Sequence, residues 1–443
     1  MTYHTNNPQT SRQTSPQSPE KRSQAQSPPY PTGRPRARWY TKLGPYPSNW
    51  KESQTAIIRK SAKDDYTNPR AYRPIALLRT LGKLLEKVIN NQLMHWAFMT
   101  NSIHPGHVGG RPGKCINDSL VALTLWIKHK WREGKIVMGI FLDFKSAYPS
   151  VNRERLIHIL IQKLCPPYLC YVINSFLSDR TTSLKIDRVV SQVFVIPNSL
   201  SQGSPLLVTL YLLYNSSLVL LISPSLNEDE ISIAYRDDVT HLLATESVQQ
   251  SQKRTKEVMT SVINPHTKKE VKWLAITLTL TLSPDPHLQI IKTKANSTIH
   301  QLKQIIQPTF GLCQKEARVL IAAVLTTRIL HRSVVWYTNK NKKSIQKQLT
   351  KELFQAILLS TGMMRQTPSP FLKVYGEIKD LTKQHIELTH NYLHTPLTAP
   401  IENAYKMLIW RELNSSQQTH PSPLNNLLEK DTFPRQHFTR AKT

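Results

Sequence analysis

Residues 231–238 read ISIAYRDD, a short apolar run that ends in two adjacent aspartates. The run has the length and the β-branched content of a buried strand, so Asp237 and Asp238 are expected where that strand ends. Upstream, residues 136–143 read IVMGIFLD, a second run of this kind that ends in Asp143. The two runs together predict a sheet that carries three carboxylates.

Three clustered carboxylates need a chemical reason to be together. They repel one another, and without a cation the pKa of at least one of them rises. A hard divalent cation such as Mg²⁺ offsets the repulsion and is bound by carboxylate and phosphate oxygens. Two such ions, about 4 Å apart, can activate an attacking 3′ hydroxyl and stabilise a leaving pyrophosphate. Spacing alone is equally consistent with solvated aspartates in turns.

Five sequence blocks resemble, in their order along the chain, the reverse transcriptases of non-LTR (LINE-type) retrotransposons. The blocks are NPRAYRPIALL with LGKLLEK (68–78 and 81–87), GGRPG (109–113), FLDFKSAYPSV (141–151), LSQGSP (200–205) and YRDD (235–238). Each block alone is a weak signal, but five in the family's order are specific. The resemblance extends from about Trp50 to Trp410.

The resemblance implies an α+β fold of the right-hand polymerase type, with fingers, a palm built on an antiparallel sheet, and a helical thumb. Residues 50–290 are expected to form fingers and palm, and residues 291–410 the thumb or connection. Composition predicts a disordered basic arm, rich in proline and serine, over residues 1–49, and a basic tail over 411–443.

The resemblance also implies roles for individual residues. Asp143, Asp237 and Asp238 would be the catalytic acids and bind two Mg²⁺ ions, with Mn²⁺ as a substitute. Phe144 would add backbone groups beside the metal and the triphosphate. Tyr148 occupies the position of an aromatic gate against a ribose 2′-hydroxyl, the alternative being a core tyrosine. The other implied nucleotide-binding residues are Gln202, Gly203, Arg73, Lys60 and Lys63, the lysines being equally explained as a solvated basic face.

The implied function is that of an RNA-directed DNA polymerase, a nucleotidyltransferase of a retrotransposon that extends a primer 3′ end. Its partners would be an RNA template, a DNA primer or target, and dNTPs, with no membrane. A net charge of +29 agrees with polyanionic partners. We expect an intracellular location, nuclear and cytoplasmic, from the need to reach RNA and chromosomal DNA. No endonuclease or RNase H domain is expected, which suggests a fragment of a longer polyprotein or a truncated gene model.

Departures from the family pattern leave a second interpretation open. Arg236 stands where the family has a small or aliphatic residue, and its guanidinium could pair with the aspartates in competition with Mg²⁺. The segment between Asp238 and Trp273 is shorter than expected for the part of the family that carries a further catalytic lysine. None of its lysines (Lys268, Lys269 and Lys272) aligns clearly with that lysine. The alternative is a catalytically decayed retroelement copy that only binds nucleic acid.

Periodicity predicts several further elements. Apolar spacing indicates helices over residues 77–93, 120–131 and 153–164, and mostly helical structure beyond Lys292. The strict alternation of residues 274–282 predicts a half-buried strand. The apolar stretch 206–222 is interrupted by polar residues 215–217, so we expect a buried core helix rather than a membrane span. Basic stretches of the thumb, such as residues 340–347, are expected to follow the primer–template backbone.

Overall fold

The computed structural model describes residues 44–60, 65–144, 147–186, 189–196, 200–222, 228–259, 270–306, 311–337, 342–376, 380–398 and 409. Most of the expected arm, all of the expected tail, and Lys63, Lys268 and Lys269 therefore lie outside the described residues. The chain divides into two compact units, Met1–Gly44 and Pro45–Thr443, and the second contains every element below.

An N-terminal sheet is built around strand β1. β1 pairs antiparallel with β2 and parallel with β5, and β5 pairs antiparallel with β6 and β7. The bounds are β1 (Glu52–Arg59), β2 (Tyr72–Leu77), β5 (Arg180–Ile186), β6 (Val189–Val190) and β7 (Phe194–Ile196), with short 3₁₀ helices η1 (Ser48–Trp50) and η2 (Pro69–Ala71). Tyr46 is buried beside this sheet, so packed residues precede Trp50, where we expect the fingers to begin.

Four helices form a second core next to this sheet. They are α2 (Thr80–Met99), α4 (Arg153–Gln162), α5 (Pro167–Leu177) and α6 (Leu207–Ile222). α6 is the expected core helix: Leu210, Leu212 and Leu213 are fully buried, because neighbouring helices cover it. The helix expected over residues 77–93 begins later, since Leu77 pairs with Gln54 in the sheet. No helix among the described residues is both long and apolar enough to cross a bilayer.

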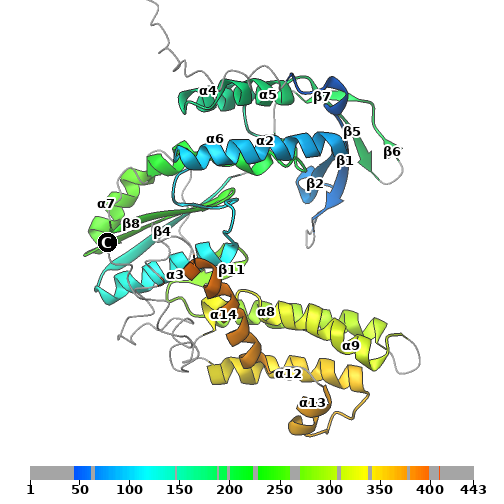
Figure 1. Ribbon diagram of the computed structural model, residues 1–443. Coiled ribbons are helices and arrows are strands. Elements are labelled where there is room, and N and C mark those ends of the chain that lie inside the picture. The colour runs from blue at the N-terminus through cyan, green and yellow to red at the C-terminus, as the bar shows by residue number, and fades with distance from the viewer. Residues whose placement is uncertain are drawn as a thin grey trace, which may run out of the picture. The chain divides into compact units, whose positions relative to one another are not determined.

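A central sheet carries the three aspartates. Its strand order is β3-β8-β9-β4, with β4, β9 and β8 antiparallel and β3 parallel to β8. The bounds are β3 (His107–Gly109), β4 (Ile136–Asp143), β8 (Glu230–Tyr235) and β9 (Asp238–Thr245), and Figure 1 shows helices α3 (Ile116–Arg132) and α7 (Val248–Met259) beside it. The two strands expected from the aspartate-bearing runs are confirmed.

Apolar side chains on both faces of the central sheet pack into hydrophobic clusters. On one face, Phe141 and Leu242 pack in the cluster that contains α3. On the other face, Ile140 and Val239 pack with Val258 of α7. Because side chains alternate along a strand, Asp143 and Asp238 belong to the first of these faces.

The strand expected over residues 274–282 is wrong in its bounds. A hairpin replaces it, formed by β10 (Glu270–Trp273) and β11 (Ile276–Thr279). Leu274 and Ala275 form the two-residue turn, both with positive φ (46° and 66°). The alternation of residues 274–282 begins inside this turn and extends beyond Thr279, so it does not mark where β11 begins or ends.

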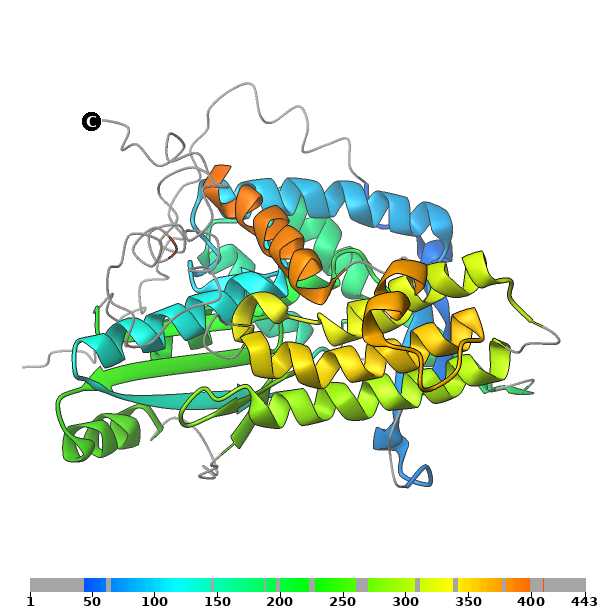
Figure 2. The same cartoon turned by 90° about the horizontal axis from the view of Figure 1, so that it is seen from below.

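The C-terminal region is helical, as expected from its periodicity. Its helices are α8 (Asp285–Ile305), α9 (Gln314–Leu320), the π-helical turn η3 (Ile321–Thr326), α10 (Thr327–Ile329), α11 (Ser333–Trp336), α12 (Lys342–Thr361), α13 (Ser369–Gly376) and α14 (Leu381–Thr398). Figure 2 shows α8 and α12 running alongside each other, and the two helices are in contact. With the two sheets, this region confirms the expected α+β fold class.

Candidate active site

The central sheet brings two of the three aspartates directly opposite each other. Asp143, the last residue of β4, is the register partner of Asp238, the first residue of β9. Asp237 lies in the two-residue connection between β8 and β9. Direct cross-strand neighbours have Cβ atoms about 5 Å apart on the same face. Strand register therefore collects carboxylates that are far apart in the sequence.

The electrostatics of these carboxylates match the repulsion expected from the sequence. Burial, followed by the negative charges of Asp237 and Asp143, raises the pKa of Asp238 to about 6. In the part of the chain that the structure describes, no ion pair or side-chain hydrogen bond engages any of the three carboxylates. The carboxylates of the cluster are thus held together without a direct ion pair to a protein cation.

A divalent cation fits this donor set by its chemistry. Carboxylate oxygens are hard ligands, and uncompensated acidic charge is what such a cation stabilises. The side chains, however, do not converge: among the described residues no three His, Cys, Asp or Glu side chains surround a common ion position. The strands align the backbones of the aspartates, so side-chain rotation is the remaining step to a binding geometry.

Arg236 adopts a different arrangement from the expected pairing with the aspartates. Its guanidinium carbon lies 5.8 Å from the centroid of the Tyr235 ring, a cation–π arrangement. No ion pair between Arg236 and the acids occurs in the described structure. Its φ of 59° lies in the left-handed region, which costs a non-glycine residue about 1 kcal/mol.

Tyr148 lies beside the acidic cluster. Its ring packs edge-on against that of Tyr211, with centroids 5.0 Å apart. Burial and the charge of Asp237 raise the pKa of Tyr148 to about 12, and Arg236 acts in the opposite direction. The ring is half-buried, which leaves part of it accessible next to the aspartates. Both the gate and the core-tyrosine interpretations thus have a structural basis.

Backbone hydrogen bonds tie the loop of residues 200–204 to both neighbouring parts. Leu200 N donates to Tyr148 O at 3.0 Å, and Ala76 N in β2 donates to Gln202 O at 2.7 Å. Gly203 has a φ of +120°, and a Cβ there would lie 2.4 Å from Ala76 O. From the sequence we expect this glycine to let a nucleotide or template come close. The structure supplies another reason, the close approach of strand β2.

Glu86 is a buried acid beside this loop whose role the sequence alone did not reveal. Its Oε2 accepts a hydrogen bond of 2.5 Å from Ser204 Oγ, and its Oε1 accepts one of 3.0 Å from Tyr46. Burial raises the pKa of Glu86, while these bonds and the nearby Arg180 lower it. Ser204 Oγ also accepts from Leu206 N, just before α6. Helical spacing contained the signal, since Glu86 shares a face with buried Ile89.

The remaining candidates are spread around this centre. Phe144 packs against the cores on both of its sides. Arg73 is exposed on β2, and Lys60 Nζ, just after β1, donates to Arg70 O in η2 at 2.8 Å. No hydrogen bond or ion pair links Arg73 or Lys60 to the aspartates in the described ranges. Lys272, on β10, is exposed.

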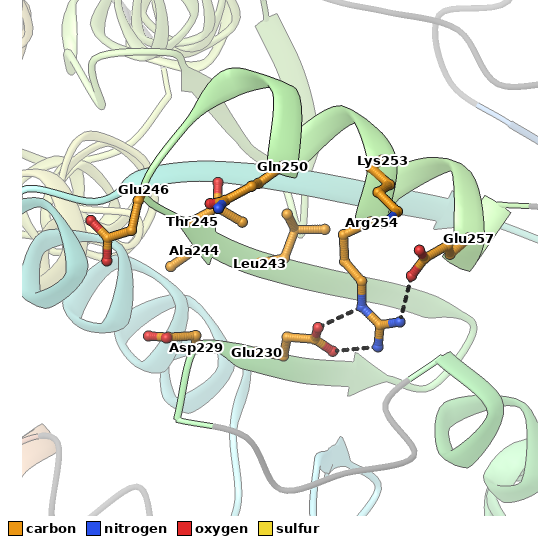
Figure 3. A pocket seen from close by; sticks show the side chains of 10 residues that line it. All are labelled: Asp229, Glu230, Leu243, Ala244, Thr245, Glu246, Gln250, Lys253, Arg254 and Glu257. Atoms are coloured by element: carbon orange, nitrogen blue, oxygen red, sulfur yellow. Dashed lines mark hydrogen bonds and ion pairs between the residues drawn. The ribbon is translucent and has the colours of Figure 1, made fainter.

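A cavity of about 390 Å³ lies at the other end of strands β8 and β9, where β8 begins and β9 ends. Figure 3 shows Arg254 of α7 directed at two acids in it. Arg254 Nε donates to Glu230 at 2.7 Å and Arg254 Nη1 to Glu257 at 3.0 Å. Since Arg254 is paired with two of its acids and none of the candidate active-site residues lines it, we interpret this cavity as a structural ion-pair site rather than an active site.

Comparison with known proteins gives a consistent picture. Residues 58–273 match the family model described as reverse transcriptase (RNA-dependent DNA polymerase). The chain is 29% identical over 208 residues to the RNA-directed DNA polymerase from mobile element jockey of Drosophila melanogaster, covering 46% of this chain and 22% of that protein. It is 23% identical over 332 residues to the probable RNA-directed DNA polymerase from transposon BS of the same species, covering 66% and 36%.

A solved telomerase from Candida albicans, in complex with the TWJ fragment of telomeric RNA, is 13% identical. It covers 90% of this chain and 68% of that chain with a TM-score of 0.42. The present chain matches between about a fifth and about a third of the length of the two retrotransposon proteins named above. It therefore corresponds to only part of each of them.

Proposed function

We propose that this chain, in which residues 58–273 form a reverse transcriptase domain of the non-LTR retrotransposon type, acts as an RNA-directed DNA polymerase. The resemblance expected from the sequence is confirmed for this domain. One observation carries the proposed activity: strand register places Asp143 against Asp238, with Asp237 in the adjoining turn.

The proposed reaction is attack of a primer 3′ hydroxyl on the α-phosphorus of a dNTP, with pyrophosphate as the leaving group. Such phosphoryl transfer depends mainly on positioning and on neutralising charge. Asp143, Asp237 and Asp238 would hold Mg²⁺, which supplies the positive charge that the triphosphate and the attacking hydroxyl require. Mn²⁺ has the same preference for oxygen ligands and would substitute.

The chain's own residues would bind and orient the nucleotide. The half-buried ring of Tyr148, next to Asp237, would meet a ribose at its 2′ position and favour deoxynucleotides. The loop at Gln202 and Gly203, held against Ala76, would present its backbone to the base pair being formed. Phe144 would contribute backbone groups beside the triphosphate, and Arg73 and Lys60, with Lys63, would bind its phosphates.

The proposed partners follow from this reaction. They are an RNA template, a DNA primer or target, and dNTPs, and the net charge of +29 agrees with binding to such polyanions. A location in both nucleus and cytoplasm would give access to RNA and to chromosomal DNA, and imaging of the tagged chain tests it.

Primer extension on an RNA template, with Mg²⁺ and dNTPs, tests the function. We expect extension by the natural chain, and a fall of about 100-fold or more in Asp237→Asn, because the variant removes a charge used in the transition state. Asp285→Asn, an exposed acid in the first turn of α8, is the control and should extend normally. Arg236→Val should extend at least as well as the natural chain.

The outcomes separate the two interpretations of the domain. Equal extension by the natural chain and Asp237→Asn would contradict the proposed site. Extension by Arg236→Val alone would mean that Arg236 silences an otherwise complete site. Absence of extension in both folded proteins, with RNA binding retained, would favour the decayed copy.

A further inference from the structure

The C-terminal helices enclose a groove that contributes no residue to the proposed polymerase site, although one of its lining residues, Lys347, belongs to the stretch 340–347 expected to follow the primer–template backbone. Its volume is about 980 Å³, and residues of α8, α12, α13 and the segment between α12 and α13 line it. Figure 1 shows α13 next to α12, away from the strands that carry the aspartates. The volume lies at the upper end of the range of roughly 300–1,000 Å³ for ligand sites.

The charge of this groove has a single sign. Four basic residues line it, and none of its lining residues is acidic: the four are Lys303, Lys347, Lys351 and Arg365. Lys347, Lys351 and Arg365 are exposed side chains. Amide and hydroxyl groups stand between them, including Gln355 and Thr350. The groove therefore suits an anion that is long enough to meet several cations at once.

The floor of the groove is apolar. Phe354, Leu358, Leu359 and Met363 line it together with the basic residues. Phosphates gain nothing from such a surface, but the flat faces of nucleobases do. In a duplex those faces are stacked inside the helix, whereas a single strand exposes them. The combination favours single-stranded over double-stranded nucleic acid.

Two exposed aromatic rings adjoin the groove on α13. Phe371 and Tyr375 are 57% and 54% exposed. Their rings are nearly parallel, with 9° between planes and 6.5 Å between centroids. Leu372, the residue after Phe371 on the same helix, lines the groove. Arg318 donates a hydrogen bond to Tyr375 O, which places another guanidinium beside them.

We propose that this groove, together with the Phe371–Tyr375 face, is a binding site for single-stranded nucleic acid, separate from the site of polymerisation. Phosphates would lie along the four basic residues, and bases would stack on the apolar floor and on the two rings. Alternation of cations with aromatic surfaces is how proteins bind single strands without sequence preference. The site goes beyond the proposed polymerase function and does not depend on it.

Fluorescence anisotropy tests this with the full chain and a labelled oligouridine of about 15 nucleotides, the upper end of known single-strand site sizes. Mg²⁺ and dNTPs are left out, so a chain without polymerase activity still gives a result. Lys351→Glu and Tyr375→Ala are each expected to weaken binding about fivefold or more, as for loss of one stacked base. The matched controls are Lys253→Glu on α7 and Tyr171→Ala on α5, a tyrosine that is 56% exposed, and both should bind normally.

Competition with an unlabelled duplex of equal length completes the test. We expect the groove variants to lose affinity for the single strand and to keep their affinity for the duplex. Binding by Lys351→Glu, Lys351→Gln and Tyr375→Ala that equals the natural chain would overturn the proposal. So would an equal loss for single strand and duplex, since the groove would then bind phosphates regardless of strandedness.

Discussion

At the scale of single residues, Asp238 shows the cost of the acidic cluster most directly. Its backbone is set by pairing with Asp143, and its carboxylate is partly removed from water beside two like charges. These effects raise the pKa of Asp238 to about 6. Because this folded-state pKa lies above the pKa in the unfolded chain, the folded protein binds a proton at Asp238 more tightly than the unfolded chain does.

The first prediction concerns stability against pH in metal-free buffer. The protonation of Asp238 stabilises the fold below the ordinary carboxyl pKa, and this contribution is lost as the pH rises through about 6. Asp238→Asn should therefore be more stable than the natural chain at pH 7.5, by about 1 kcal/mol after allowance for partial solvent screening. Urea unfolding at pH 4 and 7.5 measures this, and most of the advantage should be lost at pH 4, close to the ordinary carboxyl pKa.

Added Mg²⁺ is the internal control for this experiment. If the aspartates bind the ion, Mg²⁺ should stabilise the natural chain more than Asp238→Asn and remove the difference at pH 7.5. A less stable Asp238→Asn in metal-free buffer at pH 7.5 would mean that protein groups already compensate the charge.

At the scale of elements, the loop of residues 200–204 is the part whose position depends most on its neighbours. It is bonded to Tyr148 on one side and to Ala76 of β2 on the other. Ser204 is held by buried Glu86, which stands on α2 and also bonds Tyr46. The loop thus links the N-terminal sheet to the turn around Tyr148 that follows β4.

The second prediction tests this link. Gly203→Ala should lower the free energy of unfolding by about 3 kcal/mol, because φ of +120° is strained for alanine and the new Cβ would overlap Ala76 O. Gly113→Ala is the matched control: its φ is also positive, at +69°, but nothing lies within 4 Å of the added Cβ. Its expected loss is about 1 kcal/mol. Equal losses in chemical unfolding would show that the contact with β2 is unimportant.

At the scale of the whole molecule, the balance of charge dominates. A net charge of +29 makes binding to any polyanion strongly dependent on salt. Counterions released from nucleic acid provide most of the driving force, and their number follows the number of phosphates neutralised. The groove with four basic residues is one described place where several phosphates can be met together.

The third prediction follows from this count. For single-stranded RNA, each neutralised phosphate contributes roughly −0.7 to the slope of log K against log salt, so the four groove cations contribute about −3. We expect the natural chain to give a slope at least this steep over roughly 50–200 mM salt. Lys351→Glu should reduce the slope by about 0.7 or more. A slope near zero would indicate binding through stacking alone.

Local sequence is enough to predict the order of the chemistry-bearing blocks and the strands that lead into the aspartates. IVMGIFLD forms β4, and ISIAY of the second run lies in β8, because buried apolar runs of this length are typical of strands. It also predicted α6 and the helical C-terminal region. These features are local, since each depends on the periodicity of a few neighbouring residues.

Only the tertiary structure decided which residues meet. Asp143 pairs with Asp238, and Gly203 packs on Ala76, although each pair comes from separate parts of the chain. The cation–π contact of Arg236 depends on the turn in which this residue lies. The turn at Leu274 and Ala275 was not predicted, because the alternation used to place a strand begins inside it. The contacts of buried Glu86 and the basic groove with its aromatic face were not predicted either. Strand register and packing join segments that are far apart in the chain, and the spacing of residues in the sequence does not show which segments meet.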